Sequence, residues 1–381
     1  MVEAARTLWN DALFHRKWKW EKYHKSVTYN EQAWILTAVR KDDNELAELY
    51  SQSAQDVLRR LDKAFKSFFK GIAKFPKFKA IRNVGSFTYP QAYNGSVKIE
   101  NGRLDLSKVG GVPIVLHRQP PESDLKTCTI RREPDGSWYA SLVYDDGKEP
   151  PAPPEKIVSP VGIDLGLKSI ITTTEGQKVE PPQYLRKAEK RLKRLQRSLS
   201  RKQKGSKNRV KARELLAIQH AKVARQRLDF NQKLTTGLLK GHDLVAMEDL
   251  QVKNMVENHA LAKSIQDASW GQIGLQLQYK TLRDGKLLVK VPPQYTSQDC
   301  NVCGTRNEIG LDVRAFACKG CGEWLDRDIN GASNVLARAL KEVGQGMPEL
   351  KPVESGVPRL QPTGVVQPPV EAGTVLRGVQ P

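Results

Sequence analysis

Apolar residues in the N-terminal part of the chain recur at the spacing of amphipathic helices. Over residues 2–25 and 44–73 they return every three or four positions, which places them on one helical face. Trp18 and Trp20 fall in the first stretch. Aromatic residues on amphipathic helices are more often part of a core, and stacking on nucleic acid is the alternative. The pattern predicts a helical module over residues 1–73.

The pattern then changes to short alternating runs separated by turn residues. Runs such as residues 86–89 and 137–144 place apolar side chains at every second position, as in half-buried strands. Asn101-Gly102 stands between two such runs, and this dipeptide favours a two-residue hairpin. We therefore expect a small antiparallel β-barrel or sheet over residues 74–149.

Residues 150–156 are rich in proline, which can join neither a helix interior nor a central strand. They are expected to form a linker at a domain boundary. Beyond residue 343 the chain turns to proline, glycine and valine with little periodicity, which predicts a disordered tail over residues 344–381.

Between these segments, two apolar runs of the strand type each carry one acid. The run that starts at Ile157 leads to Asp164, just before a tight turn at Gly166, and residues 243–250 form a run that delivers Glu248. A carboxylate among apolar neighbours is costly to desolvate unless it is paired or binds a metal. For Asp164, capping of the turn is the structural alternative.

Residues 185–240 are predicted to form a basic helical hairpin, with a break near residue 205. Acidic residues are nearly absent from residues 186–211, so ion pairs within the helix cannot neutralise its cations. This favours a face that contacts phosphates over one that is merely solvated. A further helix is expected over about residues 261–283, followed by a strand at residues 286–291.

The chain carries a large excess of basic residues. Lysine and arginine number 62 against 42 acidic residues, a formal net charge of +20, which predicts a polyanionic partner such as nucleic acid. No apolar run is long enough to span a membrane, and the N-terminus lacks the plan of a signal peptide. We therefore expect a cytoplasmic, nucleoid-associated protein that does not bind membranes.

Four of the five cysteines form two Cys-x-x-Cys pairs, Cys300 with Cys303 and Cys318 with Cys321. This is the spacing of a zinc ribbon, in which four thiolates close a tetrahedron around one structural Zn²⁺. The fifth, Cys128, lies in a strand-like run and is expected to be an inert core thiol.

Three acids come from separate elements: Asp164 and Glu248 from strands, and Asp328 from the start of the last helix. Strands and helices in this order fit the RNase H-like plan, in which such acids bind two divalent metals about 4 Å apart for phosphodiester hydrolysis. Mg²⁺ is the expected metal because it prefers oxygen ligands. Asp326 is the second candidate for the third acid, although it could instead cap the helix.

The motifs that carry these residues resemble one known family. They are Gly162-Ile-Asp-Leu-Gly166, Met247-Glu-Asp-Leu250, Tyr295-Thr-Ser-Gln298 with both cysteine pairs, and Asp326-Arg-Asp-Ile-Asn330. They look like the RuvC-type nuclease and zinc-ribbon segments of the TnpB proteins, which are transposon-encoded, RNA-guided DNA endonucleases related to the type V CRISPR effectors. The Phe75-Pro-Lys-Phe-Lys79 stretch also looks like that family.

The resemblance implies a multidomain α+β protein. Residues 1–73 would form a recognition-like module and residues 74–149 a wedge-like β-barrel. An RNase H-like (RuvC) nuclease domain would span residues 157–296 and 323–343, with the zinc ribbon inserted at residues 297–322.

The resemblance also implies the activity and the partners. Asp164, Glu248 and Asp328 would be the catalytic acids and would hold two Mg²⁺ ions. The partners would be a guide RNA from the transposon end and double-stranded target DNA, cut next to a short adjacent motif. A monomer bound to RNA is expected, with the oligomeric state left open.

Alternatives to this activity are a nuclease-silent, RNA-guided DNA-binding repressor, an inactive relic, and a transposase that joins DNA ends. Family members usually begin with a short strand before the Trp9-Asn-Asp-Ala-Leu13 helix, whereas this chain starts almost directly on that helix. The difference bears on RNA binding more than on the nuclease site, because every element of that site is present.

Overall fold

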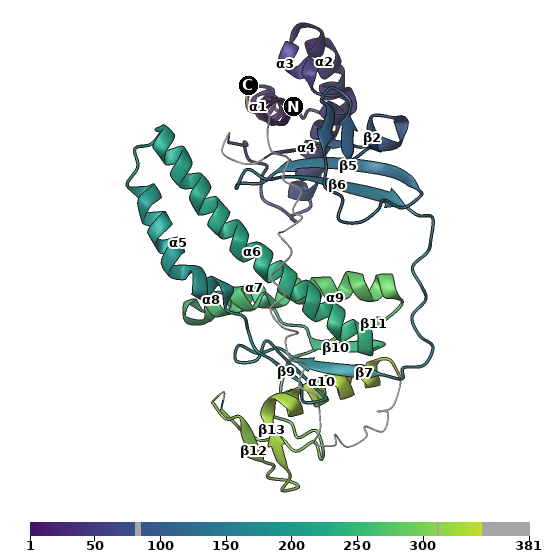
Figure 1. The fold of residues 1–381 in the computed structure, drawn as a ribbon, viewed down its shortest axis with the longest axis vertical. Helices are drawn as coiled ribbons and strands as arrows, with labels where there is room; N and C mark the ends of the chain where they lie inside the picture. The colour runs from purple at the N-terminus through teal and green to yellow at the C-terminus, as the bar shows by residue number, and fades with distance from the viewer. Residues whose placement is uncertain (81–84, 311, 345–381) are drawn as a thin grey trace. The chain divides into compact units, whose positions relative to one another are not determined.

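The computed structural model describes residues 1–80, 85–310 and 312–344, which divide into two compact units between Lys148 and Glu149. Both units contain helices and strands (Figure 1), which confirms the expected multidomain α+β class. The predicted disordered tail lies outside the described residues, apart from residue 344. No helix in the described part of the chain has the length and apolarity that crossing a membrane requires.

The first unit begins with helices that pack through one apolar core. They are α1 (Val2–Tyr23), α2 (Tyr29–Asp42), α3 (Asn44–Glu48) and α4 (Ser51–Phe69). The pattern did not predict α2, which buries only Gln32 and Leu36 and starts at a capping box between Thr28 and Glu31. The pattern favoured core positions for Trp18 and Trp20, and this was wrong. Their side chains on α1 are 40% and 56% exposed.

Two three-stranded antiparallel sheets complete this unit, as the alternating runs predicted; whether they close a barrel stays a prediction. One has the order β1-β5-β6, from β1 (Ser86–Tyr89), β5 (Asp124–Arg132) and β6 (Trp138–Asp145). The other has the order β2-β3-β4, from β2 (Val97–Glu100), β3 (Arg103–Leu106) and β4 (Gly110–Pro113). A short 3₁₀ turn, η1 (Ala92–Asn94), lies between β1 and β2.

The predicted hairpin turn and core thiol are both found in these sheets. Asn101 and Gly102 have φ values of 50° and 70° and join β2 to β3, as the two-residue hairpin turn requires. Cys128 is fully buried on β5, and burial raises the pKa of its thiol to about 12.

The second unit contains a five-stranded mixed sheet in the order β11-β10-β7-β8-β9. Its strands are β7 (Pro160–Asp164), β8 (Ile171–Thr173), β9 (Lys178–Val179), β10 (Leu244–Glu248) and β11 (Leu287–Val291). The strands β7, β10 and β11 run parallel, whereas β7, β8 and β9 form an antiparallel meander.

Helices cover both faces of this sheet, because the central strands are apolar on both sides. On β10, Leu244 and Ala246 pack against α10 (Arg327–Glu342), whereas Val245 and Met247 face the cluster that includes α6 (Lys207–Gly241) and α9 (Trp270–Asp284). In Figure 1, α10 and α9 accordingly lie on opposite sides of the strands.

The remaining elements of this unit include the predicted basic hairpin. It consists of α5 (Tyr184–Ser200) and α6, which turn at Gly205 with φ 85°. The helix predicted near residues 261–283 is in fact two, α8 (His259–Ala268) and α9, because Ser269 adopts φ 52° and ends α8. The other elements are α7 (Val252–Met255) and the two-stranded pair β12 (Ala315–Ala317) and β13 (Trp324–Asp326).

Candidate functional site

Two of the predicted acids stand at one edge of the five-stranded sheet. β7 ends on Asp164 and β10 ends on Glu248, and the two strands are parallel neighbours with Ile163 paired to Met247. Their carboxyl ends therefore meet at the same edge. In open α/β sheets this edge is where ligands bind.

The third acid arrives on α10, which crosses close to β7. A Cβ atom added to Gly162 of β7 would overlap the carbonyl oxygen of Ala332 on α10. One added to Gly331 of α10 would stand 3.1 Å from Oδ1 of Asp164. Glycine at these two positions therefore allows the first turn of α10, which carries Asp328, to approach the carboxylate of Asp164.

The electrostatics of Asp164 show that the three acids share one neighbourhood. Burial first, and then the negative charges of Glu248 and Asp328, raise the pKa of the Asp164 carboxyl to about 7. Burial also raises the pKa of Glu248. Thr296 counters this, because its hydroxyl donates a 2.5 Å hydrogen bond to Oε1 of Glu248 and favours the charged form.

Asp326 stabilises the start of α10. It is the N-cap of α10, where its Oδ1 accepts hydrogen bonds from the backbone N–H groups of Asp328 and Ile329 at 3.0 and 3.1 Å. Burial opposes its ionisation, but the hydrogen bond from Lys178 and these N–H groups hold the pKa of Asp326 below its usual value.

Two cations face the third acid from other elements. The ammonium of Lys178, on β9, lies 2.7 Å from Asp326 and 3.8 Å from Asp328. The guanidinium of Arg314, just before β12, lies 3.6 Å from Asp328. The sequence pattern singled out neither cation.

A polar stripe on α10 holds the segment that carries Thr296. Asn330 and Asn334 donate hydrogen bonds to the carbonyl oxygen of Asp299, and Asn334 also donates to that of Thr296. Arg338 donates to the carbonyl oxygens of Pro292 and Gln294. The signal in the sequence is the spacing of four between these three residues, which puts them on one helical face.

The four predicted cysteines come together beyond this segment. Cys300 Sγ lies 3.8 Å from Cys321 Sγ, Cys303 Sγ lies 3.6 Å from Cys318 Sγ, and all four sulfurs lie within 4.8 Å of one another. A tetrahedral Zn²⁺ with Zn–S bonds of about 2.3 Å separates its sulfurs by about 3.8 Å. The geometry therefore fits a four-thiolate metal site.

Within the described ranges, these thiols are the one set of three or more candidate ligands whose donor atoms are all that close. The carboxylates of Asp164, Glu248 and Asp328 do not form a second such set within these ranges. Sites that hold two ions spread their ligands over both metals.

A strongly basic groove of about 920 Å³ runs along α5. Nearly all of its lining is cationic: Lys187, Lys190, Arg191, Lys193, Arg194, Arg197, Ser198, Arg201 and Lys202. Lys193 pairs with Glu189 at 2.8 Å, and none of the described residues that line the groove is an acid. Such a surface binds a phosphate backbone.

Comparisons with known proteins extend over most of the chain. The model of the OrfB_IS605 family, described as "Probable transposase", matches residues 141–259, and that of the "Cas12f1-like, TNB domain" matches residues 270–335. A "Putative RNA-guided DNA endonuclease" of Streptomyces pristinaespiralis is 36% identical over 88% of this chain and 83% of its own length. A protein of the same description from Escherichia coli K12, InsQ, is 34% identical over 88% and 86%.

A solved structure is similar in fold. The protein in the cryo-EM structure of a Cas12f1-sgRNA-target DNA complex aligns over 88% of this chain and 80% of its own, with a TM-score of 0.54 and 15% sequence identity. At that identity the similarity shows the arrangement of the elements alone.

Proposed function

The chain belongs to the TnpB family of transposon-encoded, RNA-guided DNA endonucleases, and from this membership we propose that it cuts double-stranded DNA at sites chosen by a bound RNA. The two bacterial relatives that match most of its length carry the description of such an enzyme. The proposal extends that description to this chain and assigns the chemistry to named residues.

The observation that carries the proposal is the meeting of Asp164, Glu248 and Asp328 at one edge of the mixed sheet. An antiparallel meander β7-β8-β9 followed by parallel β10 and β11, with the order β11-β10-β7-β8-β9, is the plan of RNase H-like nucleases. This strand order supports the predicted RuvC-like domain over residues 157–296 and 323–343. In that plan, acids from the first strand, the fourth strand and the last helix lie side by side, which supports the assignment of Asp164, Glu248 and Asp328.

The three acids fit a pair of divalent cations. Burial, and after it the negative charges of Glu248 and Asp328, raises the pKa of Asp164, and positive charge between the carboxylates would offset both effects. Two Mg²⁺ ions held by these residues would supply a hydroxide nucleophile and stabilise the leaving oxygen of the phosphodiester. The hydrogen bond from Thr296 favours the charged form of Glu248 against the effect of burial, and the cap from Asp326 fixes the first turn of α10.

The four thiols are proposed to hold one structural Zn²⁺. Cys300 and Cys303 follow the segment that carries Thr296, and Cys318 and Cys321 precede β13 and α10. Closing this loop with a metal would tie both segments at the acidic edge into one rigid unit, since metal binding contributes directly to folding.

The basic groove on α5 is proposed to contact the backbone of the nucleic acids. The RNA partner would be a guide transcribed from the transposon end, and base pairing with it would select the target beside a short adjacent motif. A nuclease-silent repressor is not favoured, because Asp164, Glu248 and Asp328 are all present.

The test is a cleavage assay with protein co-expressed with the DNA that flanks its gene. Asp164→Ala should abolish Mg²⁺-dependent cleavage while the complex still binds RNA and DNA, and Asp229→Ala, an exposed acid on α6, should leave cleavage unchanged. EDTA should stop cutting and Mg²⁺ restore it. Equal loss of binding and cleavage in Asp164→Ala would show that Asp164 is structural, and the absence of a discrete copurifying RNA would remove the guide.

A further inference from the structure

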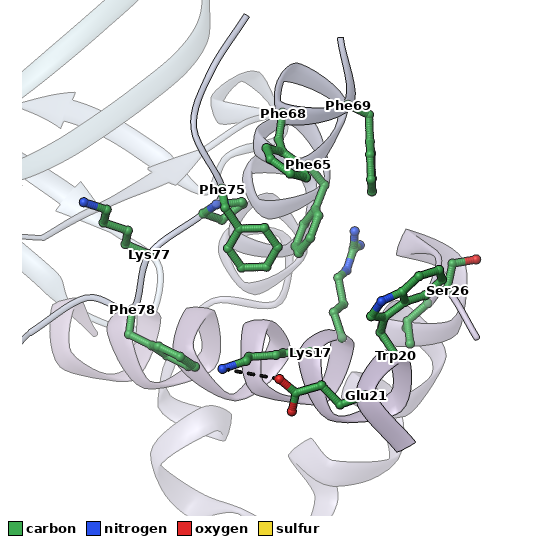
Figure 2. Close-up of a pocket in the computed structure, with 13 residues that line it drawn as sticks. Lys17, Trp20, Glu21, Ser26, Phe65, Phe68, Phe69, Phe75, Lys77 and Phe78 are labelled. Carbon is green, nitrogen blue, oxygen red and sulfur yellow. Dashed lines mark ion pairs between the residues drawn. The ribbon is translucent and has the colours of Figure 1, made fainter. Parts of the chain in front are cut away.

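The first unit contains an aromatic cavity of about 830 Å³ that the nuclease chemistry does not use. It lies among α1, α4 and the Phe75-Pro-Lys-Phe-Lys79 segment, the motif that carries part of the family resemblance. Figure 2 shows rings from all three elements around it. The rings are those of Trp20, Phe65, Phe68, Phe69, Phe75 and Phe78.

One wall of this aromatic cavity is preformed. The ring of Phe75 meets those of Phe65 and Phe68 edge to face, with centroids 5.4 and 5.3 Å apart. The segment that carries Phe75 is anchored to α1, because Asn10 and the backbone of Lys79 exchange two hydrogen bonds of 2.9 and 2.7 Å. A ligand would therefore meet a wall that is already built.

Three other rings of the cavity are exposed. Phe69 is 77% exposed, Trp20 56% and Phe78 50%, although each is large and apolar. Lys17 and Lys77 stand beside them. Scattered apolar side chains on a surface are ordinary, but a gathered set of exposed rings marks a binding site.

A second, cationic cavity of about 690 Å³ adjoins the first. It shares Phe65 and Phe69 with the aromatic cavity, and its cations include Arg59, Lys63 and Lys66. Asp62, its one acid, already pairs with Lys66 and Arg16. In the part of the chain that the structure describes, Arg59 and Lys63 form no ion pair. Arg59 donates a hydrogen bond from Nε to the hydroxyl of Tyr29 at 3.3 Å, and its other N–H groups, like those of Lys63, can donate to a phosphate.

We propose that the two cavities together bind one unpaired nucleotide of the RNA partner. The base would stack on the exposed rings of Phe69 and Trp20, and its phosphate would lie on Arg59 and Lys63. An apolar ring-lined space beside a cationic one matches the two halves of a nucleotide in both shape and charge. The inference rests on the proposed function for the identity of the RNA.

Polar groups at the edge of the aromatic cavity favour RNA over DNA. Glu21 and Ser26 line it and offer a carboxylate and a hydroxyl, the carboxylate also being paired with Lys17 at 3.5 Å (Figure 2). Both can accept a hydrogen bond from a ribose 2′-hydroxyl, the group by which proteins tell RNA from DNA. A deoxyribose lacks that donor, so a DNA nucleotide would not form these hydrogen bonds.

The experiment measures binding of a fluorescent, unstructured oligouridine to the full chain by anisotropy. Phe69→Ala should weaken binding about fivefold to a hundredfold, the range for loss of one stacking ring. Phe69→Trp should restore it. The matched control is Phe14→Ala: Phe14 is 60% exposed on α1 but lines neither cavity, so its loss should not change affinity. Lys63→Ala should lower the slope of binding against salt by about one.

The following outcomes would contradict the proposed nucleotide site. Equal weakening by Phe69→Ala and Phe14→Ala would remove the stacking site. Equal weakening for oligodeoxyuridine and oligouridine would contradict the preference for RNA, and weakening for oligodeoxyuridine alone would make a DNA strand the occupant. A fall in solution mass of the Phe69→Ala protein, with unchanged RNA affinity, would make a second copy of the chain the occupant. Asp164→Ala protein should bind oligouridine as tightly as the unaltered chain. A failure of the proposed nuclease function can therefore be distinguished from a failure of the nucleotide site.

Discussion

Gly331 of α10 lies directly against the carboxylate of Asp164, close enough that a Cβ atom at Gly331 would stand 3.1 Å from Asp164 Oδ1. A separation of 3.1 Å would be shorter than an ordinary van der Waals contact of a Cβ atom. The position of Asp164 relative to the helix that carries Asp328 therefore depends on the absence of one side chain.

Gly331→Ala should reduce cleavage more than it reduces stability. The added methyl group would displace the Asp164 carboxylate by a few tenths of an ångström, and misplacement of a catalytic group by about 1 Å can cost a hundredfold in rate. Alanine at the same time favours the helix by up to about 1 kcal/mol. The measurements are the cleavage rate and the melting temperature of the same protein.

A matched substitution separates the two effects. Gly237 lies in α6 with no atom within 4 Å of an added Cβ, so Gly237→Ala should stabilise the protein slightly and leave cleavage unchanged. If Gly331→Ala cuts DNA as fast as the unaltered protein, the close approach of α10 has no part in positioning Asp164.

Thr296→Val should weaken the response to Mg²⁺. The Thr296 hydroxyl donates a 2.5 Å hydrogen bond to Glu248, and valine keeps the shape while it removes the donor. Loss of such a partner to a metal-binding group lowers metal affinity about tenfold to a hundredfold. A titration of cleavage against Mg²⁺ should shift to higher concentration, with the rate largely recovered at saturation. An unshifted titration would argue that Thr296 only tethers its own segment.

Stability without magnesium should fall as the pH rises from about 4 to about 7. The folded chain holds the Asp164 proton up to a pKa of about 7, against an ordinary value of 3.8, so it binds more protons than the unfolded chain in this window. Each pH unit is worth about 1.4 kcal/mol, which gives an upper limit of about 4 kcal/mol. The melting temperature in magnesium-free buffer should follow this fall, and Asp164→Asn should flatten it. A fall of equal size in Asp164→Asn would assign it to other groups.

Zinc content gives an independent check of the four-thiol site. Purified protein should contain about one zinc ion per chain, since four thiolates close one tetrahedral site. Cys300→Ser should lower that content and the melting temperature together. Cys128→Ser is the control, because this thiol is buried in the first unit and should not change the zinc content. Native protein without zinc would contradict the assignment.

The sequence predicted the elements whose signal is local. The apolar runs that deliver Asp164 and Glu248, the basic hairpin and the cysteine spacing each lie within a short stretch, so their patterns could be read directly. The break at Ser269 could not be predicted, because it depends on a positive φ that no glycine or proline announces. The roles of Thr296 and Lys178 also escaped prediction, since each meets a carboxylate from a segment far away in the chain.

Asp326 and Asp328 lie two residues apart, yet their substitutions should have opposite effects. Asp326 caps α10 through two backbone N–H groups and pairs with Lys178, so Asp326→Ala should lower stability by about 1 kcal/mol and leave most of the cleavage. Asp328→Ala should abolish cleavage without loss of stability in magnesium-free buffer, because it removes a negative charge that faces Asp164. Rates and melting temperatures of the two variants, measured side by side, decide the assignment. If Asp326→Ala abolished cleavage at unchanged stability while Asp328→Ala still cut DNA, Asp326 would be the third acid.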